Sequence, residues 1–424
     1  LVFVQASPVQ IVESWYKGFW AYLGFSMQMV VLLIFGYSLA ITRVGVKVID
    51  AITGIAKTPP QAVALVAGVA AVLALINWGL GIVAGIFLCL GAARRVKGVH
   101  WPLLVASAFI GAIAGTTWSI SITEPLLVNT AGWGWAPDII PVMEKDLGQK
   151  LAPMGFDKTI YAPASIVALI LTPIVAMLSC YFMHPTPERT RSIDPEALKK
   201  LAAESQFTLE KPKEMALADK LNWSRTIWIL TCIMIFAAIF LWFQKKSFLQ
   251  LDLNMYNFIF IGLAMLLHEN LARFVESIKM ATKAAFGIIL QFPFYAGIFG
   301  IMAYTGLLKV VAGWFVAISN TFTYPLVTMI SSGIVNMFIP SSGGIWMVQG
   351  PVMILAASSL GVGFPLTVMA FTAGEVLTNT IQPFWALPLL GATGTEMRTI
   401  MGYCLIACLF EFILVALIYL FLPM

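Results

Sequence analysis

Two clusters of small and polar residues interrupt apolar stretches of this 424-residue sequence and could together bind a small ligand. The first cluster comprises Asn77, Gly79, Gly81, Thr116, Thr117, Ser119 and Ser121. The second comprises Asn336, Ser341, Ser342, Gly343, Thr378, Asn379, Thr380 and Gln382. Glycines let a ligand approach the backbone, and amide and hydroxyl side chains supply neutral donors and acceptors. One such Ser or Thr alone is more often a helix-packing residue, but two matching clusters favour a binding site.

The chemistry expected of these clusters follows from broken helices. A helix that breaks inside a membrane presents free N–H groups at the start of one half and free carbonyls at the end of the other. Such a break can hold an anion and a cation, and a carboxylate with Na⁺ is the natural pair. We therefore expect substrate and ion binding at both clusters, with Na⁺ sites at the tips that carry Asn77 and Asn336. No other metal and no cofactor is expected.

Glu375 is the only charged residue between Lys309 and Glu396. An ionisable group in such a region costs roughly 2.5–3.5 kcal/mol on insertion scales, so it is usually functional. Three roles remain open: Glu375 could carry a coupled proton, ligate a cation or serve as a neutral hydrogen-bonding group. Glu124, near a helix end, and Glu411, which could face another helix, are weaker candidates.

The residues around the two clusters favour a small, singly charged anion. Neither cluster contains Lys or Arg, so a substrate carboxylate would be held by helix ends and neutral donors rather than by a cation. Aromatic residues nearby could wall a compact pocket for a short alkyl chain, although packing is an equally good explanation for each of them. These aromatic residues are Trp78, Trp118, Phe338, Trp346, Phe384 and Trp385. In the apolar run 289–298, Pro293 predicts a kink, and substrate contact by Gln291 or Tyr295 is the weaker interpretation.

The composition places these residues in a polytopic membrane protein. The chain is 60% hydrophobic and 11% charged, with a mean hydropathy of +0.91, whereas soluble chains have about a quarter of their residues charged. This excludes disordered, nucleic-acid-binding and secreted disulfide-rich classes. The five cysteines lie in apolar stretches without CxxC spacing, so neither disulfides nor a zinc site is indicated. The net charge of +5 is expected to mark cytoplasmic loops.

Apolar stretches of about 20 residues predict the membrane crossings. Single crossings are expected over 22–42, 153–183, 226–243, 253–267, 285–304 and 399–422. The apolar run at residues 1–4 resembles the tail of a preceding helix that is missing from this chain.

Two further regions predict helical hairpins that enter and leave on one face. The first hairpin, about 59–93, is broken at 77–81 and has cationic flanks on both sides, which places its open end in the cytoplasm. The second, about 323–360, has its tip at 336–344 and nearly uncharged flanks, which suggests that it opens outside. Non-helical backbone at that depth is tolerated only where it lines a cavity.

The two regions read as copies of each other. Residues 102–127 align without a gap on 365–390, and Gly111 falls on Gly374. Loop charges indicate that the copies are inverted, with Lys245-Lys246 as the one awkward pair. We thus expect an all-α polytopic fold with a first inverted repeat at 1–183 and a second at 226–424. Each repeat holds a re-entrant hairpin and a broken helix (101–128 and 365–391), and a polar, partly helical cytoplasmic connector at 184–225 joins them.

Several motifs resemble a known family. They are Lys57-Thr-Pro59, Ile76-Asn-Trp-Gly79, Gln291-Phe-Pro-Phe-Tyr-Ala-Gly297, Pro340-Ser-Ser-Gly-Gly344, Gln349-Gly-Pro351, Gln382-Pro-Phe-Trp-Ala-Leu-Pro388 and Met401-Gly-Tyr-Cys404. Together they resemble the bacterial short-chain fatty-acid transporter family, associated with acetoacetate and butyrate uptake. The resemblance covers nearly the whole chain. The stretch 115–125 departs from the glycine-rich family pattern, which puts the exact substrate in doubt.

The resemblance carries further expectations. The family is similar to the ion transporter superfamily, whose sodium/dicarboxylate symporters have opposed re-entrant hairpins. It implies a homodimer in the inner membrane, an elevator-type movement of the hairpin domain and a small organic anion as substrate. Secondary active transport of short-chain fatty acids such as butyrate or acetoacetate is the function so implied.

Other functions remain open on the sequence alone. A sodium-coupled symporter for dicarboxylates or other organic anions is the first alternative, and a passive channel is a remoter one. An intramembrane enzyme is disfavoured, because His100, His184 and His268 lie at predicted helix ends and no HExxH or nucleophile–base spacing occurs. The neutral polar clusters suit Na⁺ and Glu375 suits H⁺, so the coupling ion stays open. No nucleic-acid partner is expected.

Overall fold

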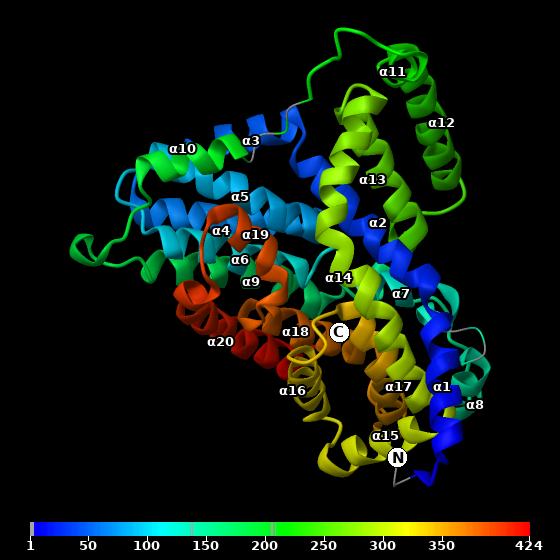
Figure 1. The fold of residues 1–424 in the computed structure, drawn as a ribbon. Coiled ribbons are helices and arrows are strands. Elements are labelled where there is room, and N and C mark those ends of the chain that lie inside the picture. Colours follow the sequence, from blue (N-terminus) through cyan, green and yellow to red (C-terminus); the bar gives the residue numbers. More distant parts are fainter. Residues whose placement is uncertain (1–3, 136, 138, 205–206, 208) are drawn as a thin grey trace.

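The computed structural model describes every residue except 1–3, 136, 138, 205–206 and 208, so the predicted helix tail at residues 1–4 lies largely outside the described part (Figure 1). Among the described residues all regular structure is helical, which confirms the expected all-α class. Eight of these helices are long and apolar enough to cross a membrane, so the protein is a multi-pass membrane protein.

The helices have the following bounds. In the first half they are α1 (Pro8–Ala21), α2 (Leu23–Ala40), α3 (Arg43–Thr53), α4 (Pro59–Ile76), α5 (Trp78–Arg95), α6 (Trp101–Thr116), α7 (Thr123–Val128), α8 (Ile140–Leu147) and α9 (Pro163–Phe182). In the second they are α10 (Pro195–Glu204), α11 (Leu217–Asn222), α12 (Arg225–Phe243), α13 (Leu253–Leu267), α14 (Leu271–Tyr304), α15 (Leu307–Ile318), α16 (Tyr324–Asn336), α17 (Ser342–Leu360), α18 (Phe364–Thr378), α19 (Leu387–Thr393) and α20 (Met397–Phe421). Short 3₁₀ turns include η6 (Asn379–Ile381) and η7 (Phe384–Ala386).

Each of the expected single crossings contains a helix, with two adjustments. The helix expected over 153–183 begins only at Pro163, because an irregular segment with one 3₁₀ turn precedes it. The crossing expected over 285–304 is the second half of α14, a continuous 34-residue helix. The first half of α14 is not apolar enough to cross a membrane. Pro293 lies inside this helix. Hydropathy alone does not predict α1, α3, α8 and α15, which are shorter than a span.

The first helix break is built by Asn77, which ends α4 and begins α5. α4 starts with Thr58 and Gln61 in a capping box, followed by Pro59 at a position where the missing N–H costs nothing. At Asn77 the backbone turns extended (φ −154°, ψ 123°), and its Oδ1 accepts a 2.9 Å hydrogen bond from the N–H of Leu80. One residue therefore stops one helix and caps the next, and α4 packs against α5.

The second break spans five residues between α16 and α17. Asn336 is the last residue of α16, and Ser341 caps α17 by accepting a 3.1 Å hydrogen bond from the N–H of Gly344. The breaks expected at 77–81 and 336–344 thus coincide with real interruptions of the helices.

The aligned glycines Gly111 and Gly374 occupy equivalent packing positions. On α6, a Cβ built at Gly111 would lie 2.0 Å from the carbonyl oxygen of Ala67 on α4. On α18, a Cβ at Gly374 would lie 2.1 Å from the carbonyl oxygen of Met329 on α16. Only glycine allows the helices to approach so closely. The α4–α6 contact and the α16–α18 contact are therefore built in the same way.

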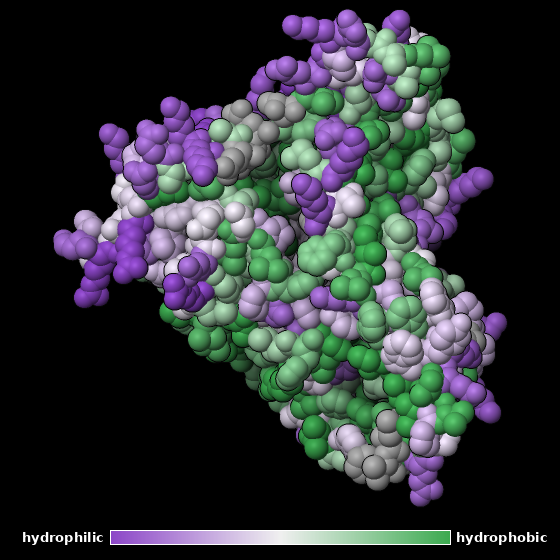
Figure 2. All heavy atoms as spheres, viewed as in Figure 1, coloured by the Kyte–Doolittle hydropathy of each residue, from purple (hydrophilic) through white to green (hydrophobic). Residues whose placement is uncertain are grey.

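The helices of the two breaks lie in different parts of the molecule, α4 and α5 on the left and α16 and α17 in the lower part of Figure 1. Figure 1 shows α4, α5, α6 and α9 side by side next to α18, α19 and α20, while α14 runs alongside α1 and α2. Figure 2 shows hydrophilic side chains gathered over α3, α10 and α11, whereas the surface over the central helices is mostly hydrophobic. The polar segment 184–225 carries the two short helices α10 and α11, as its expected partly helical character requires.

Two neutral histidines link the segment after α9 to the start of α6 through hydrogen bonds. The backbone N–H of Arg191 donates to Nδ1 of His100 at 3.0 Å, and the N–H of His100 donates to Nε2 of His184 at 3.2 Å. The acceptor nitrogens must be unprotonated, which leaves the other nitrogens facing the Tyr403 hydroxyl and the Pro185 carbonyl. Burial lowers the pKa of His100, with help from His184 and Arg191, and burial also lowers the pKa of His184.

Acidification is therefore expected to loosen this contact. The pKa of His100 in the folded protein lies below the usual 6.5, so the unfolded state binds a proton at a higher pH than the folded state does. The stabilisation that neutral His100 provides is therefore complete above pH 6.5 and is lost as the pH falls through the folded pKa. We expect the melting temperature of the purified protein to fall as pH is lowered from about 7.5 to about 5.5. The variant His100→Asn, whose Oδ1 can accept from Arg191 without titrating, should fall less steeply. An equal slope in both proteins would contradict this role.

Candidate functional site

A narrow cavity of about 40 Å³ lies where the two helix breaks meet. Its polar wall is formed by Thr116, Thr123, Ser341, Ser342, Gly343 and Asn379. Its apolar wall is formed by Met29, Trp78, Ile82, Ile113, Ile122, Ile288, Phe292 and Trp385. No charged side chain lines this cavity. The smaller, polar part of its wall can thus form hydrogen bonds, while the larger, apolar part suits a hydrocarbon chain.

The N-terminus of α17 opens onto the cavity. Ser341 uses its side chain for the N–H of Gly344 and its carbonyl for the N–H of Ile345. Within the described part of the chain, the N–H groups of Ser342 and Gly343 have no hydrogen-bond partner. Free N–H groups at the positive end of a 19-residue helix favour an anion. Gly343 is needed for space, because a Cβ there would lie 2.2 Å from Cζ of Phe25.

The N-terminus of α5 differs from that of α17 at its first N–H group, which is bonded within the protein. The N–H of Trp78 donates to the Ser121 hydroxyl at 3.0 Å, and the Ser119 hydroxyl, 2.7 Å from that of Ser121, bonds the Leu75 carbonyl at 3.0 Å. Asn77 is fully buried, and its Nδ2 donates to the Tyr256 hydroxyl at 2.9 Å. The first break is therefore held by internal hydrogen bonds.

Tyr256 is not among the site residues expected from the sequence. Its hydroxyl, on α13, accepts a hydrogen bond from Nδ2 of Asn77 and donates one to the Ile76 carbonyl at 2.9 Å. It therefore bonds both the residue that caps α5 and the last carbonyl of α4. The only signal in the sequence is a phenol within an apolar crossing. That signal does not reveal which break the phenol reaches.

The second break keeps unpaired oxygen atoms. Nδ2 of Asn336 donates to the Thr378 hydroxyl at 3.0 Å and to Oδ1 of Asn379 at 2.8 Å. Within the residues that the structure describes, Oδ1 of Asn336 and the hydroxyl of Thr380 are buried without a hydrogen-bond partner. Gln382 accepts a 2.6 Å hydrogen bond from the N–H of Phe384. Oδ1 of Asn336 is thus the free acceptor that a cation at this tip could use.

The structure brings together some of the predicted site residues and separates others. Thr116, Ser341, Ser342, Gly343 and Asn379 share the cavity wall. The remaining ones lie outside that wall: Asn77, Gly79, Gly81, Thr117, Ser119, Asn336, Thr378, Thr380 and Gln382. Gly81 serves the packing of the helix pair, since its Cβ would lie 2.5 Å from that of Ala74. Thr117 bonds back to the Ile113 carbonyl at 3.1 Å.

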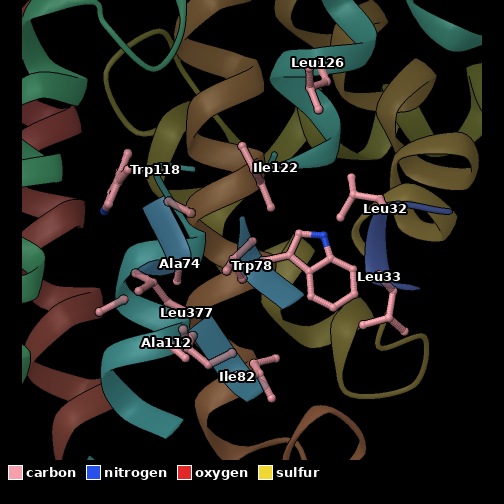
Figure 3. Close-up of a cluster of buried hydrophobic side chains, with 14 of the residues drawn as sticks. Leu32, Leu33, Ala74, Trp78, Ile82, Ala112, Trp118, Ile122, Leu126 and Leu377 are labelled. Atoms are coloured by element: carbon pink, nitrogen blue, oxygen red, sulfur yellow. The ribbon is translucent and has the colours of Figure 1, made fainter. Parts of the chain in front are cut away.

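Most of the aromatic residues expected at the pocket lie elsewhere. Trp78 and Trp385 line the cavity, and Figure 3 shows the Trp78 indole among Leu33, Ile82 and Ile122. Trp118 and Trp346 are fully buried in the packing, and Phe338 is 80% exposed. Gln291 and Tyr295 bond each other at 3.0 Å and do not line the cavity either.

A second, larger cavity adjoins the first. It has a volume of about 370 Å³ and shares Trp78, Ile82 and Trp385 with the smaller one. The Trp78 and Trp385 rings stand edge to face with centroids 5.0 Å apart at this boundary. Lys283 of α14 lines the larger cavity, as do Gly79 and Phe384. A cation therefore lies at the wall of the cavity that adjoins the uncharged one.

The three intramembrane glutamates are all fully buried. Glu375 lies on α18 beside Ser342, and its carboxyl group neighbours that of Glu124 on α7. From the sequence, Glu124 is the weaker candidate because it lies near a predicted helix end, and that position does not reveal its contact with Glu375. Glu411 lies apart, on α20, near Cys180, Cys404 and Cys408.

Known proteins resemble this chain along nearly its whole length. The family described as short chain fatty acid transporter matches residues 1–422. Two curated relatives, from Haemophilus influenzae and Escherichia coli, are provisionally named short-chain fatty acid transporters. Each is 36% identical over 407 residues, which covers 96% of this chain and 88% of the relative.

Two solved transporter structures share the fold. The Alcanivorax borkumensis YdaH transporter superposes with a TM-score of 0.58 at 15% identity, over 96% of this chain and 86% of its own. Neisseria gonorrhoeae MtrF, described among antimetabolite efflux pumps, gives 0.55 at 14% identity, over 98% and 84%. By its relatives the protein is a transporter rather than an enzyme. The resemblance seen in its motifs is confirmed, and the chain belongs to the short chain fatty acid transporter family.

Proposed function

We propose that the protein is a secondary active transporter that carries short-chain monocarboxylates, such as butyrate or acetoacetate, across the inner membrane. One observation carries the proposal: an uncharged cavity has the free N-terminus of α17 on one side and apolar side chains on the other. The name shared by the curated relatives supports the substrate class.

The cavity suits one carboxylate and one short chain. The N–H groups of Ser342 and Gly343 hold the carboxylate, and the amide of Asn379 lies in the same wall. The alkyl chain contacts Ile113 and Phe292. A second carboxylate would be buried without a cation or a second free helix end, which costs several kcal/mol. Dicarboxylates are therefore disfavoured.

The proposed architecture consists of two inverted repeats, 1–183 and 226–424, joined by the cytoplasmic connector 184–225. The helix pairs α4–α5 and α16–α17 are re-entrant hairpins whose tips meet at the substrate. The equivalent packing of Gly111 and Gly374 supports the repeat. By family resemblance, the protein is a homodimer and moves its hairpins past a fixed scaffold in an elevator-type cycle.

Cation coupling completes the proposal. Unpaired oxygen atoms near the cavity belong to two groups of different chemistry. Oδ1 of Asn336 is a neutral acceptor that suits Na⁺, and the carboxyl groups of Glu124 and Glu375 suit H⁺. Neither use needs a cofactor.

Counterflow of labelled butyrate in proteoliposomes tests the substrate class. Vesicles preloaded with unlabelled butyrate should accumulate label transiently above protein-free vesicles, and an excess of succinate should leave the signal unchanged. A parallel series with K⁺ in place of Na⁺ tests the sodium requirement. Inhibition by succinate would shift the assignment to dicarboxylates, and steady conductance without counterflow would indicate a channel.

Lys283 should speed the capture of the anion. A cation at the wall of the larger cavity raises the local concentration of anions through its field, and salt screens that field. We expect Lys283→Gln to raise the KM for butyrate counterflow a few-fold at low ionic strength. The difference should vanish at about 1 M salt, where the Debye length is about 3 Å.

Lys279→Gln is the matched control, because Lys279 lies on the same helix but pairs with Glu276 at 3.0 Å and does not line the cavity. An equal effect of both substitutions would assign the change to overall charge rather than to the cavity.

A further inference from the structure

Glu124 and Glu375 bring two carboxyl groups together directly behind the cavity wall. Both residues are fully buried, and their carboxyl groups interact with each other although they come from α7 and α18. Among the described residues, no donor is placed to form a well-aligned hydrogen bond with any of the four carboxyl oxygens. Buried polar atoms are rarely left unpaired, so a ligand that hydrogen-bonds both carboxyl groups would be favoured here.

The neighbouring hydroxyl groups connect the pair to the cavity. The Thr372 hydroxyl, next to Glu124, already donates to the Val368 carbonyl at 2.9 Å. Ser342 lies beside Glu375 and also lines the cavity. Thr123, the residue before Glu124, lines the same cavity. The wall residues Ser342 and Thr123 thus lie between the carboxyl pair and the proposed substrate position.

A proton is the ligand that fits this pair. Two carboxylates in contact repel each other strongly where water is excluded, so the fully ionised pair is unfavourable without a nearby cation and binds a proton readily. One proton placed between them supplies the missing hydrogen bond and removes one charge. A metal ion would require more ligands, and no group of three or more His, Cys, Asp or Glu side chains occurs in the described part of the chain.

The surroundings contain no other group that could take over this role. The helices α6, α16, α17 and α18 carry no Lys or Arg, and Arg398 at the start of α20 is exposed beside Glu396. The remaining titratable side chains on the elements packed against α7 and α18 are Tyr324, Tyr403, Cys404, Cys408, Glu411 and Tyr419. The three tyrosine hydroxyls contact Met353, His100 and Ser165, while Glu411 neighbours the cysteines.

We propose that Glu124 and Glu375 form a shared proton site whose protonation is coupled to anion binding in the cavity. The inference rests on the proposed function, because the anion is the monocarboxylate held at Ser342 and Gly343. An ionised pair repels this carboxylate, so the pair takes up one proton from the aqueous phase when the anion binds. By linkage each ligand raises the affinity for the other to the same extent. The protein then carries a monocarboxylate together with a proton.

Proton uptake during butyrate binding tests the coupling. Calorimetry of the purified protein in buffers of different ionisation heat counts the protons bound per butyrate. We expect about one proton in the wild type, and a Kd that rises about tenfold for each unit of pH where the linkage is complete. The double variant Glu124→Gln/Glu375→Gln keeps the shape of both side chains and should bind butyrate with no proton uptake and a flat pH dependence.

Glu411→Gln is the matched control, since Glu411 is equally buried and unpaired but lies away from the cavity. It should behave as the wild type does. Butyrate binding without proton uptake in the wild type, or unchanged uptake in the double variant, overturns the proton site and leaves the proposed function intact.

Infrared spectroscopy tests the proton site if the double variant fails to fold or if butyrate does not bind. If the double variant fails to fold, the wild type alone decides: butyrate should increase the band of protonated carboxyl groups, and an unchanged band overturns the proposal. If butyrate does not bind, the proposed substrate is wrong. The ligand-free protein should then still show a titrating carboxyl band that Glu375→Gln removes, and its persistence in that variant overturns the proton site.

Discussion

Valine in place of Gly374 is expected to abolish the yield of folded protein. Its Cβ would lie 2.1 Å from the Met329 carbonyl oxygen and 2.3 Å from the Ser332 hydroxyl, so α16 and α18 would have to separate. Ser332 bonds across this contact to the Phe371 carbonyl at 2.9 Å, and separation would break that bond as well. Overpacking against a backbone atom has no cheap relief, and we expect a loss of about 3 kcal/mol or more.

Gly111→Val should have the same effect, because its Cβ would lie 2.0 Å from the Ala67 carbonyl oxygen. Gly402→Val is the matched control: this glycine lies on α20 and a Cβ there meets nothing within 4 Å. Fluorescence-detected size-exclusion chromatography and thermal melting of detergent extracts measure the outcome. Gly374→Val or Gly111→Val protein as stable as Gly402→Val protein would refute the close helix contact.

The fold could be predicted from the sequence where the signal is local. Asn77 ends α4 and caps α5, and Ser341 caps α17 with its own side chain, so both breaks follow from residue type and from the apolar runs around them. The helix breaks depend on neighbours within a few residues. The gap-free offset pairs Gly111 with Gly374 in the sequence, and the structure shows that each of these glycines makes a close helix contact.

The partners within the site could not be predicted in this way. The bond between Asn77 and Tyr256 and the meeting of Glu124 with Glu375 join distant segments, and no periodicity records which segments pack together. The two clusters also looked alike in sequence. In three dimensions Ser119 and Ser121 close the first break, whereas the N–H groups of α17 stay free, so the likeness of residue types concealed a difference in hydrogen bonding.

This asymmetry means that a charge placed at Ser341 should separate folding from binding. Aspartate is an excellent N-cap: its carboxylate can accept the N–H of Gly344 as the Ser341 hydroxyl does, and it interacts favourably with the positive end of α17. We therefore expect Ser341→Asp to fold with a melting temperature at or above that of the wild type.

Binding of the substrate should nevertheless be lost in Ser341→Asp. The new carboxylate occupies the end of the cavity at which the substrate carboxylate is proposed to sit, and two like charges about 4 Å apart repel by about 4 kcal/mol at an effective dielectric constant of 20. That energy corresponds to an affinity about 1,000-fold lower. Ser341→Asn is the control, since asparagine caps equally well without a charge. Scintillation proximity binding of labelled butyrate compares the affinities of the two variants. Only the charge distinguishes the two side chains, so affinities within about threefold of each other would contradict the proposed position of the substrate carboxylate at α17.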